Sequence, residues 1–222
     1  MNRDKYVSAA VIRRLPRYYR LLGELFERGV VRISSNELAD MMKLTASQIR
    51  QDLNCFGGFG QQGYGYNVAS LHSEIGKIIG LDKGFNAILV GVGNLGRAFA
   101  NHINFAQAGF NLTALFDKNV ETIGTQIANL TVMDADMIES FCKDNIVDTA
   151  ILCVPDSAAQ ETSEKLIACG ITSFWNFTHY DIKVMHPELT IENANLIDGL
   201  VALCYMLNSN SEEADNCAES NS

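Results

Sequence analysis

The sequence of 222 residues lacks the features of several classes of protein. No apolar run reaches the roughly 18 residues that suggest a membrane span, and the N-terminus, MNRDK, does not lead into the apolar core of a signal peptide. The six cysteines form no C-x-x-C pair, and the four histidines are scattered. We therefore expect a cytoplasmic protein with reduced thiols, without a metal site and without membrane association.

Positive charge is scarce overall but concentrated near the N-terminus. The net charge is −9, yet residues 1–56 hold ten Lys/Arg and six Asp/Glu, whereas the other 166 residues hold seven and twenty. An acidic chain with one basic module favours a single local contact with a polyanion over general affinity for polyanions. A solvated, arginine-rich helix face is the alternative.

Residues 1–80 show helical periodicity followed by a glycine-rich stretch. Apolar residues recur at helical spacing over 7–26, although Pro16 predicts that one helix ends near Leu15 and that another begins at the proline. Two capping-box sequences follow, SSNE and TASQ, each at the start of a short helix. Two short capped helices joined by about three residues are typical of a helix-turn-helix.

The second of these helices would expose polar side chains. Ile49 and Leu53 fall on one face, where they can pack against Leu38 and Met41. Polar side chains in the N-terminal half of such a helix can reach base edges and phosphates in a DNA major groove. The side chains turned outward are Ser47, Gln48, Arg50, Gln51 and Asn54. The alternative is an ordinary helical hairpin.

The glycine-rich stretch FGGFGQQGYGYNV follows this helix directly. Glycines allow tight hairpin turns and let a backbone approach a phosphate strand. No G-K-[ST] follows, which excludes a P-loop, and the aromatic residues Phe59, Tyr64 and Tyr66 disfavour a linker. A helix-turn-helix followed by a hairpin is a winged helix. The hairpin residues predicted to contact DNA are Gly60, Gln62 and Gly63.

A second glycine motif, GVGNLG at 91–96, lies between a predicted strand at 87–90 and a predicted helix. In this context G-x-G-x-x-G is the fingerprint of a Rossmann fold that binds pyrophosphate at a helix N-terminus. Asp117 ends the next predicted strand, where a carboxylate binds ribose hydroxyls and favours NAD(H) over NADP(H). The predicted cofactor-binding residues of these two segments are Gly91, Val92, Gly93, Asn94, Leu95, Gly96, Asp117 and Lys118.

Further strands and helices complete an α/β fold. DTAILCVP and ITSFWNF read as strands on either side of a helix, and the chain then forms a strongly apolar C-terminal helix. Such a helix is expected to be buried against another subunit or between domains. The expected divisions are a DNA-binding domain at 1–80, a dinucleotide-binding domain at 81–195, a dimerisation helix at 196–208 and a disordered acidic tail at 209–222.

With both motifs in place, the chain resembles the Rex family of redox-sensing transcriptional repressors over about residues 7–207. The segments that carry the resemblance include RLPRYYRLL, SSNELA, QIRQDL, FGGFGQQGYGY and GVGNLGRA. The resemblance implies an α/β homodimer, with a winged-helix domain, a Rossmann domain and a C-terminal helix exchanged between subunits. It also implies binding to palindromic operator DNA and its release by NADH.

The resemblance assigns further residues, and the chain departs from it at some of them. Arg14 and Arg50 match DNA-contacting positions of the family, and Val154 and Pro155 match the edge of its dinucleotide pocket. The family usually carries cations where this chain has Gln51 and Gln62. Residues that match the nicotinamide site and hinge, three of them departures, are Arg20, His102, Asn195 and Leu196.

Two other functions are compatible with the motifs. One is an NAD-dependent oxidoreductase, for which His102 and His179 are the only candidate acid–base groups. The other is a DNA-binding regulator whose Rossmann domain holds a nucleotide structurally, with a weak redox response or none. The preferred prediction is a repressor that senses the NADH/NAD ratio and has no catalytic residues.

Overall fold

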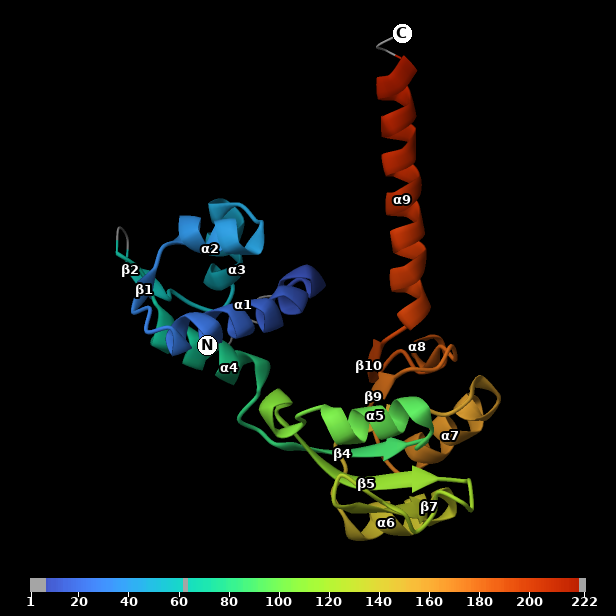
Figure 1. Cartoon of the computed structure of the whole chain (residues 1–222). Helices are drawn as coiled ribbons and strands as arrows, with labels where there is room; N and C mark the ends of the chain where they lie inside the picture. Colours follow the sequence, from blue (N-terminus) through green and yellow to red (C-terminus); the bar gives the residue numbers. More distant parts are fainter. Residues whose placement is uncertain (1–6, 62–63, 220–222) are drawn as a thin grey trace. The chain divides into compact units, whose positions relative to one another are not determined.

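The computed structural model describes residues 7–61 and 64–219. The chain divides into two compact units, Met1–Lys83 and Gly84–Ser222 (Figure 1). Among the described residues, no helix has the length and apolar character needed to cross a membrane.

The first unit contains four helices and a small sheet among its described residues. The helices are α1 (Ala9–Glu27), α2 (Ser35–Met42), α3 (Ala46–Asn54) and α4 (Val68–Ile79), and the strands are β1 (Arg32–Ile33), β2 (Gly60–Gln61) and β3 (Gly65–Asn67). The strands form an antiparallel sheet in the order β1-β3-β2. This is a helix-turn-helix followed by a hairpin, as the sequence predicted.

Helix α1 runs through Pro16 without a break, so the prediction of two helices that meet at this proline is wrong. Leu15, Tyr18 and Leu22 lie on either side of the proline along the chain, yet all are buried in one hydrophobic core. Their shared burial offsets the backbone hydrogen bond that proline cannot donate.

The caps of α2 and α3 explain why the two helices are separate. The Ser34 hydroxyl accepts a hydrogen bond from the N–H of Glu37, whose carboxylate in turn accepts one from the N–H of Ser34. Thr45 caps α3 through the N–H of Gln48. Ile49 and Leu53 are buried as predicted, but the partner from the end of α2 is Met42, which is 3% exposed. Met41 is 52% exposed.

The hairpin of β2 and β3 requires a glycine at position 65. Gly65 has a φ of +70°, and a Cβ at this position would lie 2.6 Å from the carbonyl oxygen of Ile33 in β1. A side chain would therefore push the hairpin away from β1. We call the segment from Gly60 to Asn67 the wing.

The second unit is a parallel sheet with helices on its faces. Its strands are β4 (Phe85–Val90), β5 (Phe110–Asp117), β6 (Gln126–Ile127), β7 (Leu130–Asp134), β8 (Thr149–Leu152), β9 (Ser173–Asn176) and β10 (Thr190–Asn193). Its helices are α5 (Asn94–His102), η1 (Ala106–Ala108), η2 (Ala135–Met137), α6 (Ile138–Asp144), α7 (Asp156–Ala168), α8 (Ile182–Met185) and α9 (Leu196–Glu219).

The sheet has the order β10-β9-β8-β4-β5-β7-β6, and only β6 is antiparallel to its neighbour. The strand order reverses beside β4, whose neighbours are β5 and β8. Side chains alternate between two cores: Ile88 and Val90 point into one, and Ala87 and Leu89 into the other. This is the Rossmann arrangement, in which ligands bind beyond the carboxyl ends of the strands at the point of reversal.

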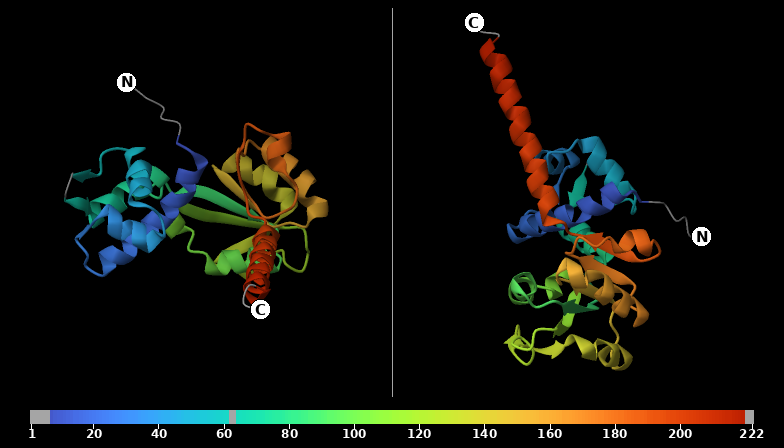
Figure 2. Two further views of the ribbon diagram at one scale, coloured as in Figure 1. Left: turned by 90° about the horizontal axis from the view of Figure 1, so that it is seen from above. Right: turned by 90° about the vertical axis from the view of Figure 1, so that its right-hand side faces the viewer.

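Helix α9 is longer than the sequence predicted and extends away from the rest of its unit (Figures 1 and 2). The segment expected as a disordered tail continues the helix as far as Glu219. The physical reason is that residues 209–219 contain no glycine or proline and include good helix formers such as Glu212 and Glu213. A helix already nucleated by the apolar segment can propagate through such residues at little cost.

Candidate functional site

A cavity of about 460 Å³ lies at the carboxyl ends of β4, β5 and β8. Its wall includes Val90 and Asp117, the last residues of β4 and β5, and Cys153, the first residue after β8. Nine of the ten predicted cofactor-binding residues line it, and Gly96 is the exception. The predicted residues that line the cavity are Gly91, Val92, Gly93, Asn94, Leu95, Asp117, Lys118, Val154 and Pro155.

The three glycines of GVGNLG have different surroundings. Gly91 has a φ of +94°, and a Cβ there would lie 2.5 Å from the carbonyl oxygen of Cys153. A Cβ on Gly96 would collide with the carbonyl oxygen of Gly91, so this glycine lets α5 pack against the strand–helix turn. A Cβ on Gly93 would meet no atom within 4 Å. The space at Gly93 is therefore open, as a bound pyrophosphate requires.

The N-terminus of α5 has unused donors for an anion. Gly93 is the N-cap residue and supplies no side-chain hydrogen bond to the first turn of the helix. The first N–H groups of a helix have no partner inside it, and the helix dipole is positive at this end. The turn thus fits the phosphates of a dinucleotide.

Asp117 is held in place by the backbone around it. Its Oδ2 atom accepts a hydrogen bond from the N–H of Val92 at 2.6 Å, and its Oδ1 atom accepts one from the N–H of Asn119 at 2.8 Å. Each carboxylate oxygen can accept more than one hydrogen bond. Asp117 can therefore join the glycine turn to the next loop and still accept bonds from ribose hydroxyls.

Several residues of the cavity were not predicted from the sequence. They are Val90, Asn119, Thr122, Ala135, Cys153, Ala158 and Thr162. Asn119 and Thr122 follow Asp117 in the same loop, and Ala135 follows β7, a strand that the sequence reading did not identify. The rule that parallel strands end at one edge would have indicated these positions once the strands were known.

Cys153 does not add negative charge to this cavity. Burial raises the pKa of its thiol to about 12, so the group is neutral near pH 7. Among the described residues, no group of three or more His, Cys, Asp and Glu side chains is arranged to hold a metal ion.

The residues predicted near the nicotinamide belong to different units. His102 ends α5 and is exposed, but it does not line the cavity. Asn195 accepts a hydrogen bond from the N–H of Ile197 at the start of α9, and Leu196 is 67% exposed. Arg20 lies on α1 in the first unit and is exposed.

The outer face of α3 is the candidate DNA surface. Ser47, Arg50, Gln51 and Asn54 are exposed, and Gln48 is half-buried. Arg50 donates a hydrogen bond from Nη1 to the hydroxyl of Ser35 at 2.9 Å, which links the two helices of the helix-turn-helix. In the wing, Gly60 lies in β2, whereas Gln62 and Gly63 lie outside the described residues.

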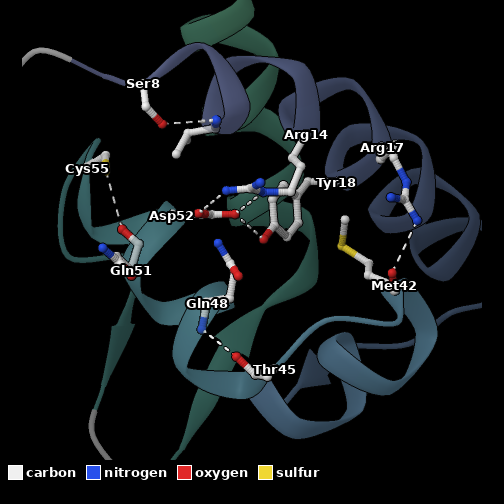
Figure 3. A network of polar contacts seen from close by, with 11 residues as sticks. Ser8, Arg14, Arg17, Tyr18, Met42, Thr45, Gln48, Gln51, Asp52 and Cys55 are labelled. Atoms are coloured by element: carbon white, nitrogen blue, oxygen red, sulfur yellow. Dashed lines mark hydrogen bonds and ion pairs between the residues drawn. The ribbon is translucent and has the colours of Figure 1, made fainter.

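Arg14, which was predicted to contact DNA, bonds to a carboxylate of its own unit. Its Nε and Nη2 atoms donate to the two carboxylate oxygens of Asp52 at 2.7 and 2.8 Å, and Asp52 is 1% exposed. The hydroxyl of Tyr18 donates to the same carboxylate at 2.9 Å. Figure 3 shows both side chains of α1 pointing at Asp52 on the inner face of α3.

This network ties α1 to α3 through one buried carboxylate. The hydrogen bonds that Arg14 donates to Asp52 raise the pKa of the Arg14 guanidinium, and burial together with the same carboxylate raises the pKa of Tyr18. Arg17 adds a bond from Nη2 to the carbonyl oxygen of Met42 at the end of α2, at 3.2 Å (Figure 3). Sequence spacing places an arginine on a helix but does not reveal a buried partner from another helix.

Family models match both units of the chain. One described as "Putative DNA-binding protein N-terminus" matches residues 6–54, and one described as "CoA binding domain" matches residues 82–180. Together with the solved structures below, these matches confirm the predicted fold class, an N-terminal DNA-binding domain and a C-terminal Rossmann-type domain.

Similar solved structures cover almost the whole chain. The crystal structure of RSP in complex with β-NAD⁺ and operator DNA has 49% sequence identity and a TM-score of 0.88, and the match covers 96% of this chain and 97% of that one. RSP in complex with β-NADH has 46% identity and a TM-score of 0.86, with 96% and 99% covered.

Curated relatives agree with these structures. The redox-sensing transcriptional repressor Rex of Clostridioides difficile (strain 630) is 53% identical over 204 residues, which are 92% of this chain and 97% of the relative. The protein of the same name from Caldanaerobacter subterraneus subsp. tengcongensis is 50% identical over 208 residues, which are 94% and 92%. These relatives are regulators, which confirms the expectation that the protein is not an oxidoreductase. The chain belongs to the Rex family of redox-sensing transcriptional repressors.

Proposed function

We propose that this protein is a homodimeric repressor of the cytoplasm that binds palindromic operator DNA and releases it when NADH fills the cavity at GVGNLG. The observation that carries the proposal is the presence of two separate sites in one chain. A helix-turn-helix with a polar outer face lies in the first unit, and a dinucleotide-sized cavity lies in the second. The similar structure RSP holds operator DNA together with β-NAD⁺ in one crystal and β-NADH in another.

On the DNA side, α3 is the proposed recognition helix. Exposed polar side chains at its N-terminal half match the way that such helices read base edges and bind phosphates. Arg50 also bonds to Ser35, so its guanidinium has a preferred direction along the outer surface. The residues proposed to contact DNA from this helix are Ser47, Gln48, Arg50, Gln51 and Asn54, with Gly60, Gln62 and Gly63 added from the wing.

On the nucleotide side, NAD(H) is the proposed ligand. The N–H groups at the start of α5 would bind the pyrophosphate, and Asp117 would accept hydrogen bonds from the adenosine ribose. A 2′-phosphate would meet the negative charge of Asp117, which disfavours NADP(H). NADH and NAD⁺ differ in the oxidation state of the nicotinamide, and the protein responds to this difference when the nucleotide is bound.

Dimerisation through α9 is supported by the exposure of its apolar residues. Leu200, Tyr205 and Met206 are between 59% and 76% exposed in the single chain. Large apolar side chains that are exposed together on one helix mark an interaction surface. We propose that a second copy of the chain covers it, by exchange of α9, and that the two-fold symmetry of the dimer requires a palindromic operator.

The switch requires a difference in NADH affinity between two states of the dimer. NADH releases DNA only if it binds the state that does not bind DNA more tightly than the state that does. We propose that Arg20, His102, Asn195 and Leu196 contribute to this choice between states. Asn195 is neutral, so a hydrogen bond that its side chain accepts lacks the charge-assisted part of an arginine–carboxylate bond.

A titration of operator binding with NADH and NAD⁺ tests the proposal. We expect NADH to weaken operator binding at least tenfold, whereas NAD⁺ at the same concentration leaves it nearly unchanged. If both nucleotides bind but neither alters operator affinity, the nucleotide has only a structural role. If the protein does not bind a palindromic operator at any nucleotide concentration, the assignment of α3 is wrong.

A further inference from the structure

The wing lacks positive charge of its own. Between Arg50 and Lys77 the sequence contains no lysine or arginine, and this interval includes both strands of the wing. Yet phosphate contacts supply much of the affinity of DNA-binding proteins, and each normally involves a cation or a backbone N–H group. If the wing contacts a phosphate strand through a cation as well as through backbone N–H groups, that cation comes from elsewhere in the fold.

Arg32 is placed to supply this cation. It lies in β1, which pairs with β3 so that Arg32 is opposite Asn67. Its Nη1 atom donates a hydrogen bond to the carbonyl oxygen of Tyr64 at 3.2 Å, and its Cζ atom lies 6.0 Å from the centre of the Tyr64 ring. Two contacts with Tyr64 thus hold the guanidinium beside this residue of the wing.

The guanidinium of Arg32 is also accessible to a ligand. Arg32 is exposed, and Tyr64 is 70% exposed. Within the part of the chain that the structure describes, no carboxylate forms an ion pair with Arg32. An arginine has five N–H donors in a fork that matches phosphate geometry, and the bond to Tyr64 uses only one of them.

Arg14 and Arg32 differ in the groups that bind their guanidinium ions. The positive charge of the Arg14 guanidinium is balanced by the negative charge of the buried Asp52 carboxylate, to which Arg14 donates two hydrogen bonds. Arg32 bonds to a neutral carbonyl and lies near an aromatic ring, so its full charge is retained. Contact with an aromatic face orients an arginine without cancelling its charge.

We propose that Arg32 is the phosphate-binding residue of the wing, supplied by the neighbouring strand β1 and oriented by Tyr64. The ligand is a phosphate of the DNA backbone, so Arg32 contributes affinity without reading sequence. This inference rests on the proposed binding of operator DNA.

The test compares the salt dependence of operator binding in three proteins. Arg32→Gln removes the charge but keeps an N–H donor for the Tyr64 carbonyl. Lys77→Gln is the control for the loss of one positive charge, because the Lys77 ammonium is already paired with Glu74 at 2.8 Å. Affinity is measured between roughly 50 and 200 mM salt, the range in which phosphate contacts dominate.

For Arg32→Gln we expect about a tenfold loss of affinity near 100 mM salt. We also expect the plot of log affinity against log salt to be shallower by about 0.9 for each subunit bound. Lys77→Gln should match the wild type in both quantities. The double variant Arg32→Gln/Gln62→Arg, which returns a cation to the hairpin itself, should recover the lost slope.

Other results would overturn the assignment. An unchanged slope for Arg32→Gln, with or without a loss of affinity, means that Arg32 only shapes the wing. A slope that falls equally in Lys77→Gln means that net charge, and not this residue, is responsible. Failure of the wild-type protein to bind any operator would instead remove the proposed function on which this inference rests.

Discussion

The two candidate sites of this protein are built from different parts of the chain. The nucleotide cavity is formed largely by backbone: a glycine turn, the uncapped start of α5 and the carboxyl ends of three strands. The candidate DNA-binding face is formed by side chains on α3, and their directions depend on packing within the first unit. The first kind of site can be recognised from a short motif, whereas the second cannot.

Arg14 and Gly91 illustrate the difference. Gly91 has the conformation and the close backbone neighbour that the G-x-G-x-x-G pattern requires. Arg14 matches the family equally well in sequence, but its side chain turns inward to a carboxylate 38 residues later in the chain. A backbone requirement is local in sequence, whereas the partner of a long side chain is determined by the tertiary structure.

The largest predicted effect is that of Gly91→Ala on the nucleotide site. The new Cβ would lie 2.5 Å from the carbonyl oxygen of Cys153, at a φ that alanine rarely adopts. We expect NADH affinity to fall at least a thousandfold, about 4 kcal/mol, while binding of operator DNA without nucleotide persists. Fluorescence titration of NADH measures the first quantity, and a mobility-shift assay the second.

Gly93→Ala is the matched control for this variant. Gly93 has a φ of −71°, and its Cβ would meet no atom of the protein within 4 Å. The free energy of unfolding of the Gly93→Ala variant should equal that of the wild type. The new methyl group would, however, occupy the space assigned to the pyrophosphate. Normal NADH binding by Gly93→Ala would show that the pyrophosphate lies elsewhere.

The second prediction concerns the buried pair of Arg14 and Asp52. Arg14→Met leaves the Asp52 carboxylate, which is 1% exposed, with the Tyr18 hydroxyl as its one remaining side-chain donor among the described residues. We expect the first unit to lose about 3 kcal/mol of stability, the low end for broken buried pairs, because the Arg14 side chain is 19% exposed. Urea denaturation followed by circular dichroism measures the loss.

Two further measurements show whether Arg14 holds α1 against α3 or contacts DNA. Arg14→Met/Asp52→Leu replaces the pair by apolar side chains and should recover part of the stability: such replacements are often neutral, but this one leaves the buried Tyr18 hydroxyl without its acceptor. In Arg14→Met, operator affinity should fall without a change in its dependence on salt. A shallower salt dependence at normal stability would instead make Arg14 a phosphate contact.

Much of the fold could be predicted from the sequence because its signals are local. The caps at Ser34 and Thr45 define the start of α2 and α3, and the strand, glycine turn and helix around Gly91 define the Rossmann core. The continuity of α1 through Pro16 could not be predicted, since it depends on core packing on both sides of the proline.

Within the nucleotide site, too, residues that belong to a local sequence signal could be predicted and the others could not. Asp117 was found from its distance to the glycine motif and its place at a strand end. Thr122 and Thr162 line the same cavity, but only the folding of the loop after Asp117 and of α7 brings them there. No sequence spacing connects them to the motif.

The third prediction tests Asp117, which contributes a side chain to a site formed largely by backbone. Asp117→Asn keeps an oxygen that can accept a hydrogen bond from the N–H of Val92 but loses the negative charge. We expect the ratio of NADPH to NADH affinity to rise about tenfold, about 1.4 kcal/mol. Titrations with both dinucleotides measure the ratio. A ratio equal to that of the wild type would mean that Asp117 does not face the adenosine ribose.

The smallest predicted effect is that of Gln51→Lys on the DNA-binding face. Gln51 is exposed on α3, and its backbone oxygen, not its side chain, accepts the bond from Cys55, so the fold should tolerate the change. If the side chain faces a phosphate, the new ammonium should raise operator affinity several-fold and steepen the salt dependence by about 0.9 per subunit. Gln51→Met, with a side chain of similar length and no charge, is the control and should leave the salt dependence unchanged. An unaltered salt dependence in Gln51→Lys would place this side chain away from the DNA backbone. The phosphate contacts of α3 would then be restricted to Arg50 and the other exposed side chains of this helix.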